Sequence, residues 1–521
     1  MTLRDTGPRS RARLRRRLVS ALALGACGGA SGAFGTQQAA NGSQPGALGT
    51  QPGPVAAPGS PSGPMAALAG PLSGWLRAAG LSPEQLGLVV WPLEAASPAF
   101  QHNSGRAFNP ASTMKLLTSY AGLSVLGPEY RWRTSAFLRG QLRGDVLQGD
   151  LVLRGGGDPK LVAEDLAQFV SRMRGEGLRE LRGDLVIDDG LYAPIDETAA
   201  AFDGDPSQPY NVLPHPLLMN FKSARLLVQP GRERAEIGFD PPLADLRIDN
   251  QVRLLAGPCR HGVAGLQVRD TPPVPGGTAG VSVSGSYSAA CGEQGLFTAL
   301  LSHRRFIHGF FKAAWESAGG VFLGDTRAER GAARGQPWLE WVSPRTLADV
   351  VRDINKFSNN VMSRNLLLQL AAEPGRGPSA EPASVERARR VLERWLESIG
   401  LRFPELVIEN GAGLSRIERL APLSLAALLR HAAASPVAEV FRQSLSVVGR
   451  DGTMRNRLVG EPMAGQAWIK TGSLNEVRSL AGYVDAASGR RQVVVAFING
   501  PRAEMAPALL DQLLRWVHAH G

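Results

Sequence analysis

This sequence has few cysteines, few lysines and no long apolar run. No internal stretch approaches the roughly 18 apolar residues that a membrane-spanning helix needs. The three cysteines show no zinc-finger spacing, and no RNA-binding signature occurs. The net charge of +11 therefore does not indicate a nucleic-acid partner. It fits either an affinity for an anionic envelope polymer or genome-driven arginine usage alone.

Lysine supplies only 6 of the 57 basic residues, and arginine supplies the rest. Lysine can give up its proton near neutral pH, which arginine cannot do. A chain that uses lysine so sparingly invites the question of what each lysine does. The six are Lys115, Lys160, Lys222, Lys312, Lys356 and Lys470.

The N-terminus has the organisation of an export signal. A cluster of arginines ends at Arg17, and a short stretch of apolar and small residues follows, so we expect a signal sequence over residues 1–27. The last four residues of this stretch, L-G-A-C, resemble a bacterial lipobox, whose cysteine, here Cys27, is lipidated after cleavage. Ordinary cleavage within residues 26–33 and a twin-arginine signal at residues 15–16 stay open. Each alternative exports the protein to the periplasm or cell envelope, and lipidation would attach it to the membrane.

Export also sets the redox environment of the remaining cysteines. Cys259 and Cys291 form an even pair in an oxidising compartment, which predicts a disulfide. A free, buried pair is the alternative.

Composition and periodicity divide the rest of the chain. Residues 28–64 are rich in Gly, Pro, Ser and Gln and predict a disordered tether. We expect a catalytic domain formed by residues 65–133 and 337–521, with helices over 66–79, 344–370, 383–399 and 503–519. Its antiparallel strands are expected over 467–472, 479–485 and 492–499. Residues 134–336 have a different, β-rich texture and predict an inserted accessory region of two small domains.

Ser112 and Lys115 form an S-x-x-K motif at the predicted start of a helix, after Pro110. Residues three apart share one face of a helix. A serine hydroxyl is a poor nucleophile until a base removes its proton, and a neutral lysine amine can be that base. A helix N-cap followed by an exposed lysine is the alternative interpretation.

Two further motifs become informative together with the first. K-T-G at residues 470–472 lies on a predicted strand and precedes Ser473, and its cation and hydroxyl suit a carboxylate. A hairpin turn is the alternative. S-N-N at residues 358–360 heads a helical stretch, although S-x-N also occurs at 363–365 and 473–475.

Taken in order, S-x-x-K, S-x-N and K-T-G form the motif set of penicillin-binding proteins and serine β-lactamases. More narrowly, the chain resembles the D-alanyl-D-alanine carboxypeptidase/endopeptidase family of class C low-molecular-mass penicillin-binding proteins (the penicillin-binding protein 4 type, peptidase family S13). Supporting stretches are L-V-L-R-G-G-G-D-P (151–159), E-N-G-A-G-L-S-R (409–416) and G-R-D-G-T-M-R-N-R (449–457). The large insertion between Ser112 and Ser358 distinguishes this family.

The resemblance implies an α/β (α+β) transpeptidase-like fold, in which an antiparallel sheet is flanked by helices and carries a large β-rich insertion. It also implies a serine peptidase of peptidoglycan stem peptides that β-lactam antibiotics trap covalently, with no metal or cofactor. Ser112 would be the nucleophile and Lys115 its base, and Ser358, Asn360 and Lys470 would relay a proton to the leaving amine. Lys470 and Thr471 would hold the terminal carboxylate, Gly472 would leave room beside the strand, and Ser473 would share the oxyanion hole with Ser112.

The match leaves some points open. The middle motif reads S-N-N where many members of the family have S-D-N. Tyr210 and Asn211 are candidates for contacting the third residue of the stem peptide, and a plain structural loop is the alternative. A β-lactamase or esterase of the same superfamily and a non-catalytic wall-binding protein are the rival functions. The oligomeric state is not predicted.

Overall fold

The computed structural model describes residues 64–260, 262–271, 279–372 and 381–521. The predicted signal sequence, Cys27 and all of the predicted tether except Pro64 lie outside these residues. In the described part of the chain, no helix is both long and apolar enough to cross a membrane.

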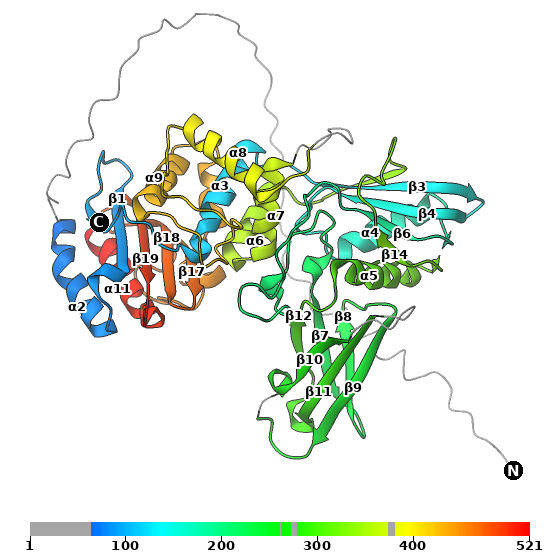
Figure 1. The fold of residues 1–521 in the computed structure, drawn as a ribbon. Coiled ribbons are helices and arrows are strands. Elements are labelled where there is room, and N and C mark those ends of the chain that lie inside the picture. The colour runs from blue at the N-terminus through cyan, green and yellow to red at the C-terminus, as the bar shows by residue number, and fades with distance from the viewer. Residues whose placement is uncertain (1–63, 261, 272–278, 373–380) are drawn as a thin grey trace, which may run out of the picture. The chain divides into compact units, whose positions relative to one another are not determined.

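A six-stranded antiparallel sheet contains strands from both ends of the described chain (Figure 1). β1 pairs with β19, with Leu88 opposite Ala496, so early and late segments build one sheet. The three C-terminal strands were predicted from sequence to within two residues. In spatial order the strands are β16 (Ser446–Val447), β17 (Ala467–Leu474), β18 (Val477–Asp485), β19 (Arg491–Asn499), β1 (Leu86–Pro92) and β2 (Phe100–His102).

The two faces of this sheet bury different sets of helices, because successive side chains of a strand point to opposite faces. Val494 and Ala496 of β19 pack in one core with α2 (Ala69–Ala79) and α11 (Pro507–His520). Val493 and Val495 pack in the other core with the remaining helices of this region. Those helices are α3 (Lys115–Val125), α6 (Leu347–Phe357), α7 (Asn360–Ala371), α8 (Val385–Ser398), α9 (Pro422–Ala433) and α10 (Ala438–Ser444).

Between α3 and α6 the chain forms a seven-stranded mixed sheet. Its strands are β3 (Arg133–Arg143), β4 (Val146–Gly155), β5 (Glu180–Leu181), β6 (Leu185–Asp188), β13 (Val321–Phe322), β14 (Thr326–Ala328) and β15 (Leu339–Val342). β4 and β6 are parallel and connected through α4 (Ala163–Gly175), so this part of the sheet contains a small α/β unit. The chain enters on β3 and leaves on its neighbour β15. This arrangement supports an inserted region, for which we propose the bounds 133–342.

Two three-stranded sheets form a further core within the inserted region. One contains β7 (Ala224–Pro230), β8 (Ala235–Asp240) and β12 (Gln294–Thr298), and the other contains β9 (Leu246–Leu255), β10 (Gln267–Thr271) and β11 (Ala279–Ser288). One helix, α5 (His303–Ser317), was missed by the β-rich prediction for this stretch. The Ser302 N-cap and the buried aromatic residues Phe306 and Phe310, four residues apart, were signals for it.

Candidate active site

Ser112 lies in a tight turn that leads into a buried helix. The 3-10 helix η3 (Ala111–Met114) continues directly into α3, which confirms the predicted helix start. Ala111 has a φ of 44°, a left-handed conformation that costs a non-glycine residue about 1–3 kcal/mol. Ser479 Oγ donates a hydrogen bond to Pro110 O over 2.7 Å and fastens the turn to β18. The strained residue therefore stands immediately before the candidate nucleophile and is held there by the sheet.

Lys115 is fully buried, and its amine lies among three oxygen atoms. Nζ is 3.1 Å from Ser112 Oγ and 2.7 Å from Asn360 Oδ1, and it also contacts Ala412 O. The oxygens of Asn360 and Ala412 can only accept hydrogen bonds, whereas the serine hydroxyl can also donate one. A neutral amine, with two N–H groups and one lone pair, matches this set with its lone pair facing Ser112.

The surroundings hold the pKa of Lys115 well below its usual range. Burial is the largest cause, because it disfavours the charged form, and the positive charge of Lys470 adds to it. The negative charge of Glu418 acts in the opposite direction. Burial therefore contributes more to this shift than the charge of Lys470 does.

The second motif stands at the head of α7, as expected, and it also marks the end of α6. Ser358 ends α6 in a left-handed conformation, with a φ of 58°. Asn359 then caps α7 by accepting a hydrogen bond from Met362 N over 3.0 Å, a role that Asp and Asn fill about equally well. An S-N-N sequence therefore serves this helix break as S-D-N would. Asn360 follows as the first residue of α7 and reaches Lys115.

The third motif lies on β17 and brings a second buried lysine to the site. Lys470 Nζ donates to Ser358 Oγ over 2.9 Å and to Thr471 O over 2.8 Å. Burial lowers the pKa of Lys470 to about 7. Thr471 Oγ1 donates to Thr453 Oγ1 over 2.9 Å. A cation that can titrate and two hydroxyl groups therefore lie together at this end of the strand.

Gly472 allows β17 to approach the Ser112 turn closely. A Cβ atom at this position would lie 2.2 Å from Ser479 Oγ and 2.8 Å from Ser112 N, too close for either contact. The room that Gly472 leaves beside the strand is used by the chain's own backbone at Ser112. The strand and the turn are thereby locked in register, with Ser473 exposed just beyond.

Comparisons with known proteins agree with this geometry. The profile of the D-Ala-D-Ala carboxypeptidase 3 (S13) family matches residues 68–520. The chain belongs to this family. It is 27% identical over 452 residues to the D-alanyl-D-alanine carboxypeptidase of an Actinomadura species, covering 82% of this chain and 80% of that protein. It is 24% identical over 407 residues to D-alanyl-D-alanine carboxypeptidase DacB of Haemophilus influenzae, covering 77% and 82%.

The S13 chain also shares its fold with a solved member. The crystal structure of penicillin binding protein 4 (dacB) from Haemophilus influenzae superposes with a TM-score of 0.69 at 21% identity, over 85% of this chain and 99% of that one. The predicted transpeptidase-like fold is therefore confirmed. Family membership makes the chain a serine-type D-Ala-D-Ala peptidase, a hydrolase.

One segment of the S13 site was not singled out from the sequence. Residues 409–418 form a loop in which residues 410–415 and Glu418 are buried, and Gly413 lies so near the nucleophile turn that a Cβ atom on it would be 1.8 Å from Ala111 O. Ala412 supplies the third oxygen on Lys115, and Glu418 is fully buried behind it. The stretch was quoted for its similarity to the family, but its acidic residue was overlooked. Glu418 lies between Ile417 and Arg419 in the sequence, and neither neighbour indicates that the glutamate is buried.

The loop that carries Tyr210 and Asn211 adjoins the site. Asn360 Nδ2 donates to Tyr210 O over 3.1 Å, so the loop touches the S-x-N motif through its backbone. The Tyr210 side chain is exposed and donates to Asp203. Asn211 is buried and donates to Asp203 Oδ1 and Asp205 O. Asn211 thus holds the loop together, while the Tyr210 ring stays accessible.

The cysteine pair of the inserted region is joined in the structure. Cys259 and Cys291 form a disulfide between segments 32 residues apart. It links the stretch after β9 to η7 (Ala289–Cys291), beyond the end of β11. The pair therefore belongs to the three-stranded sheets and has no part in the Ser112 site.

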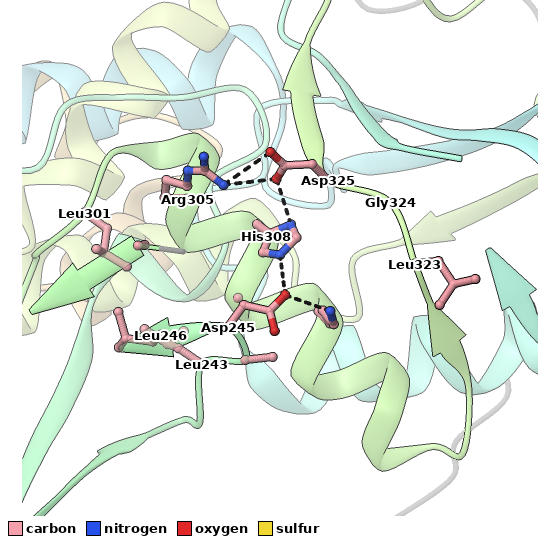
Figure 2. A pocket seen from close by; sticks show the side chains of 13 residues that line it. Leu243, Asp245, Leu246, Leu301, Arg305, His308, Leu323, Gly324 and Asp325 are labelled. Atoms are coloured by element: carbon pink, nitrogen blue, oxygen red, sulfur yellow. Dashed lines mark hydrogen bonds and ion pairs between the residues drawn. The ribbon is translucent and has the colours of Figure 1, made fainter. Parts of the chain in front are cut away.

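Figure 2 shows a separate polar cluster, around a cavity of about 260 Å³ within the inserted region. His308 Nε2 of α5 lies 3.1 Å from Asp245 Oδ2, to which Lys312 also donates over 2.7 Å. Arg305 donates to Asp325 over 3.0 Å. Every charged group here has a partner of opposite charge, so the cluster fastens α5 to its neighbours. Among residues 64–260, 262–271, 279–372 and 381–521, no group of His, Cys, Asp and Glu side chains is arranged to hold a metal ion.

Proposed function

We propose that the chain hydrolyses the bond after the penultimate D-alanine of peptidoglycan stem peptides through an acyl-enzyme on Ser112, acting as carboxypeptidase and endopeptidase. The observation that carries this proposal is the position of the Lys115 amine, between Ser112 Oγ and Asn360 Oδ1. A base in contact with the hydroxyl it must deprotonate, with its charged form disfavoured, is what serine acylation requires.

In the first step, Ser112 Oγ attacks the carbonyl carbon of the penultimate D-alanine. The hydroxyl proton passes to Lys115 Nζ, 3.1 Å away. The carbonyl oxygen becomes an oxyanion, which the backbone N–H groups of Ser112 and Ser473 stabilise. Such preorganised donors contribute about 2.7–4 kcal/mol each to the transition state.

In the second step, the tetrahedral intermediate expels the amine of the leaving residue. Ser358 Oγ delivers a proton to that nitrogen and is reprotonated from Lys470 Nζ, its neighbour at 2.9 Å. The leaving amine belongs to D-alanine in the carboxypeptidase reaction and to the neighbouring stem peptide in the endopeptidase reaction. The proton that Lys115 took from Ser112 then passes to Lys470, so that Lys115 is neutral and Lys470 is charged again. Water attacks the acyl-enzyme while Lys115 accepts a proton from it, and Lys115 returns that proton to Ser112 Oγ as the bond between Oγ and the acyl carbon breaks.

The carboxylate of the terminal D-alanine binds at Lys470 and Thr471 in this scheme. Beyond Trp468 and Ile469, which pair with β16, the outer edge of β17 has no partner strand among the described residues. An extended peptide can therefore add to this edge by backbone hydrogen bonds. The substrate would then run past Gly472 with its scissile carbonyl at Ser112.

The amide bond and carboxylate of a β-lactam resemble the D-Ala-D-Ala end, so we infer that penicillin acylates Ser112 and is released slowly. The penicillin binding protein 4 of Haemophilus influenzae was solved in complex with a β-lactam. A β-lactamase would carry out the same acylation but would release the product quickly. Turnover of the acyl-enzyme therefore separates the two functions.

The deciding experiment combines labelling with digestion of purified substrates. Penicillin treatment followed by peptide mass spectrometry should give one adduct, on Ser112, and Ser112→Ala should abolish it. Ser124→Ala, which changes an exposed serine of the following helix α3, is the matched control and should label normally. Cross-linked and uncross-linked muropeptides should both be cleaved and resolved by chromatography. Absence of the adduct would support a wall-binding protein, and rapid nitrocefin hydrolysis would support a β-lactamase.

We also propose that the protein works in the periplasm or cell envelope, where its substrate lies. The arginine cluster and the apolar stretch of residues 1–27 support export, and Cys27 supports a lipid anchor. Detergent partition of the mature protein, compared with Cys27→Ser, tests the anchor. Wild-type protein in the aqueous phase would argue for ordinary cleavage.

A further inference from the structure

Glu418 is a buried acid that the scheme above does not use. Its side chain is fully buried, and Oε1 accepts hydrogen bonds from the backbone N–H groups of Glu409, Asn410 and Gly411 over 3.1, 2.9 and 2.8 Å. Its second oxygen, Oε2, is also buried and has no hydrogen-bond partner among the described residues. A carboxylate is costly to bury, so its retention here calls for a physical reason.

The three N–H groups belong to residues 409–411, and the next residue in the chain contacts Lys115. Gly411 O accepts from Thr118 Oγ1 over 2.7 Å and from Ser363 Oγ over 2.8 Å, which fixes the segment against α3 and α7. The next residue is Ala412, whose carbonyl accepts from Lys115 Nζ. Glu418 thus holds the loop whose Ala412 carbonyl oxygen orients the Lys115 amine. If the loop shifted, Nζ would lose one of the two acceptors that aim its lone pair at Ser112.

The charge of Glu418 also differs in sign from that of both lysines in the site. Lys115 on α3 and Lys470 on β17 are fully buried. On the adjoining face of α7, Arg364 is paired with Glu197, and Glu409, Arg416 and the partly exposed Arg419 of the segment itself face solvent. Glu418 is therefore the acid that interacts with Lys115. Burial raises the pKa of Glu418 overall, although the backbone hydrogen bonds and the charge of Lys115 lower it in part.

The negative charge of Glu418 bears on the transfer of the proton from Ser112 to Lys115. When Ser112 gives its proton to Lys115, a buried ammonium forms beside Lys470, and burial and like charge both oppose it. Within the described part of the chain, the charge of Glu418 favours the proton on Lys115. A general base works best when its affinity for the proton is matched to the operating pH. Without the carboxylate the amine would be neutral but too weak a base.

We propose that Glu418 is a positioning residue for acylation, which holds the Ala412 carbonyl against Lys115 and supplies the buried negative charge that favours the proton arriving from Ser112. This inference rests on the proposed roles of Ser112 and Lys115. It assigns the 409–418 segment a part in the chemistry rather than in packing alone.

The test is the pH dependence of penicillin acylation, measured as the second-order rate constant by stopped flow. Glu418→Gln keeps an oxygen for the three N–H groups and removes the charge. Because the negative charge no longer favours the protonated amine, the acid limb of the profile should move to lower pH by about one unit, and the plateau should fall about tenfold. A purely structural glutamate would lower the amount of active protein without moving the limb.

Two further variants keep the inference open to contradiction. Glu405→Gln makes the same change at a residue that caps Ala421 N and should leave the profile unchanged. Glu418→Asp keeps the charge and should keep the limb within about half a unit while the rate falls. If the Gln variant does not fold, as judged by circular dichroism, a displaced limb in the Asp variant contradicts the proposal.

The outcomes separate this inference from the function on which it rests. If wild-type protein forms no adduct on Ser112, the proposed function is wrong. If wild-type and Glu418→Gln proteins both label Ser112 with the same pH profile and plateau, the function stands and the role of Glu418 is overturned.

Discussion

Lys115 and Lys470 in the active site are fully buried and bond only to neutral oxygens. Arg139 and Arg327 of the inserted sheet are partly exposed, and together they bond three carboxylates. Burial lowers the pKa of both lysines, whereas hydrogen bonding to Asp150 raises the pKa of Arg139. The paired guanidinium groups fasten strands together. The unpaired amines are the groups that can change protonation, and they mark the site of chemistry.

The largest expected loss of acylation, which would test the role of the buried lysines most directly, is that of Lys115→Arg. Guanidinium stays protonated, so it cannot take the Ser112 proton, and acylation by a fluorescent penicillin should fall by on the order of 10³-fold. Lys312→Arg changes a lysine that is paired with Asp245 in the inserted region and should label normally. Undiminished labelling of the Lys115 variant, with unchanged circular dichroism, would remove Lys115 from the mechanism.

The next largest effect is expected from Gly472→Ala. The new methyl group would lie 2.8 Å from Ser112 N, so the turn must move away from β17. A displacement of about 1 Å typically costs about 10²-fold in rate, which acylation kinetics will measure. Gly238→Ala, on β8 with open space around the Cβ position, is the control. Equal rates for both variants would show that the close approach is dispensable.

Titration of Lys470 should give a smaller and substrate-dependent effect. Its pKa is about 7, so the ammonium that binds a carboxylate is present below that pH and is lost above it. KM for a D-Ala-D-Ala peptide should therefore rise by up to about tenfold per pH unit above 7. The matching peptide with a C-terminal carboxamide should show no such rise. Parallel profiles for the two peptides would exclude Lys470 from carboxylate binding.

The smallest effect is expected in the paired network of the inserted sheet. Burial raises the pKa of Asp150, but hydrogen bonds from Arg139 and Asp184 N outweigh it and leave the pKa lowered. Its contribution to stability is therefore present at neutral pH and lost as the pH falls below about 4. Asp150→Asn should cost about 1 kcal/mol in urea unfolding at pH 7 and leave acylation unchanged. A change in acylation rate would mean that the two regions are coupled.

The local parts of this structure could be predicted well from the sequence. S-x-x-K needs only a helix to bring Ser112 and Lys115 together, and K-T-G needs only a strand to lie beside it. The break at Ser358 was missed because its left-handed conformation separates two helices that otherwise have continuous helical character. The helix α5 was missed although its Ser302 cap was a local signal, because four of its fifteen residues are aromatic, a type that favours strands.

Contacts between distant segments set the rest of the site. Lys115 and Asn360 are 245 positions apart and Lys115 and Ala412 are 297 apart, so no local pattern reveals that their atoms meet. The value of Glu418 lies entirely in its burial and in the three N–H groups it collects. Neither property is visible in the residues that flank it.

The place of β19 between β18 and β1 has a consequence for the order in which the enzyme is made. A ribosome delivers Ser112 hundreds of residues before it delivers β19, which joins the first strands to those carrying Lys470 and Ser479. Until β19 is in place, the strands that hold the Ser112 turn, β17 and β18, are not joined to β1. A chain that ends before β19 is therefore expected to lack an assembled Ser112 site.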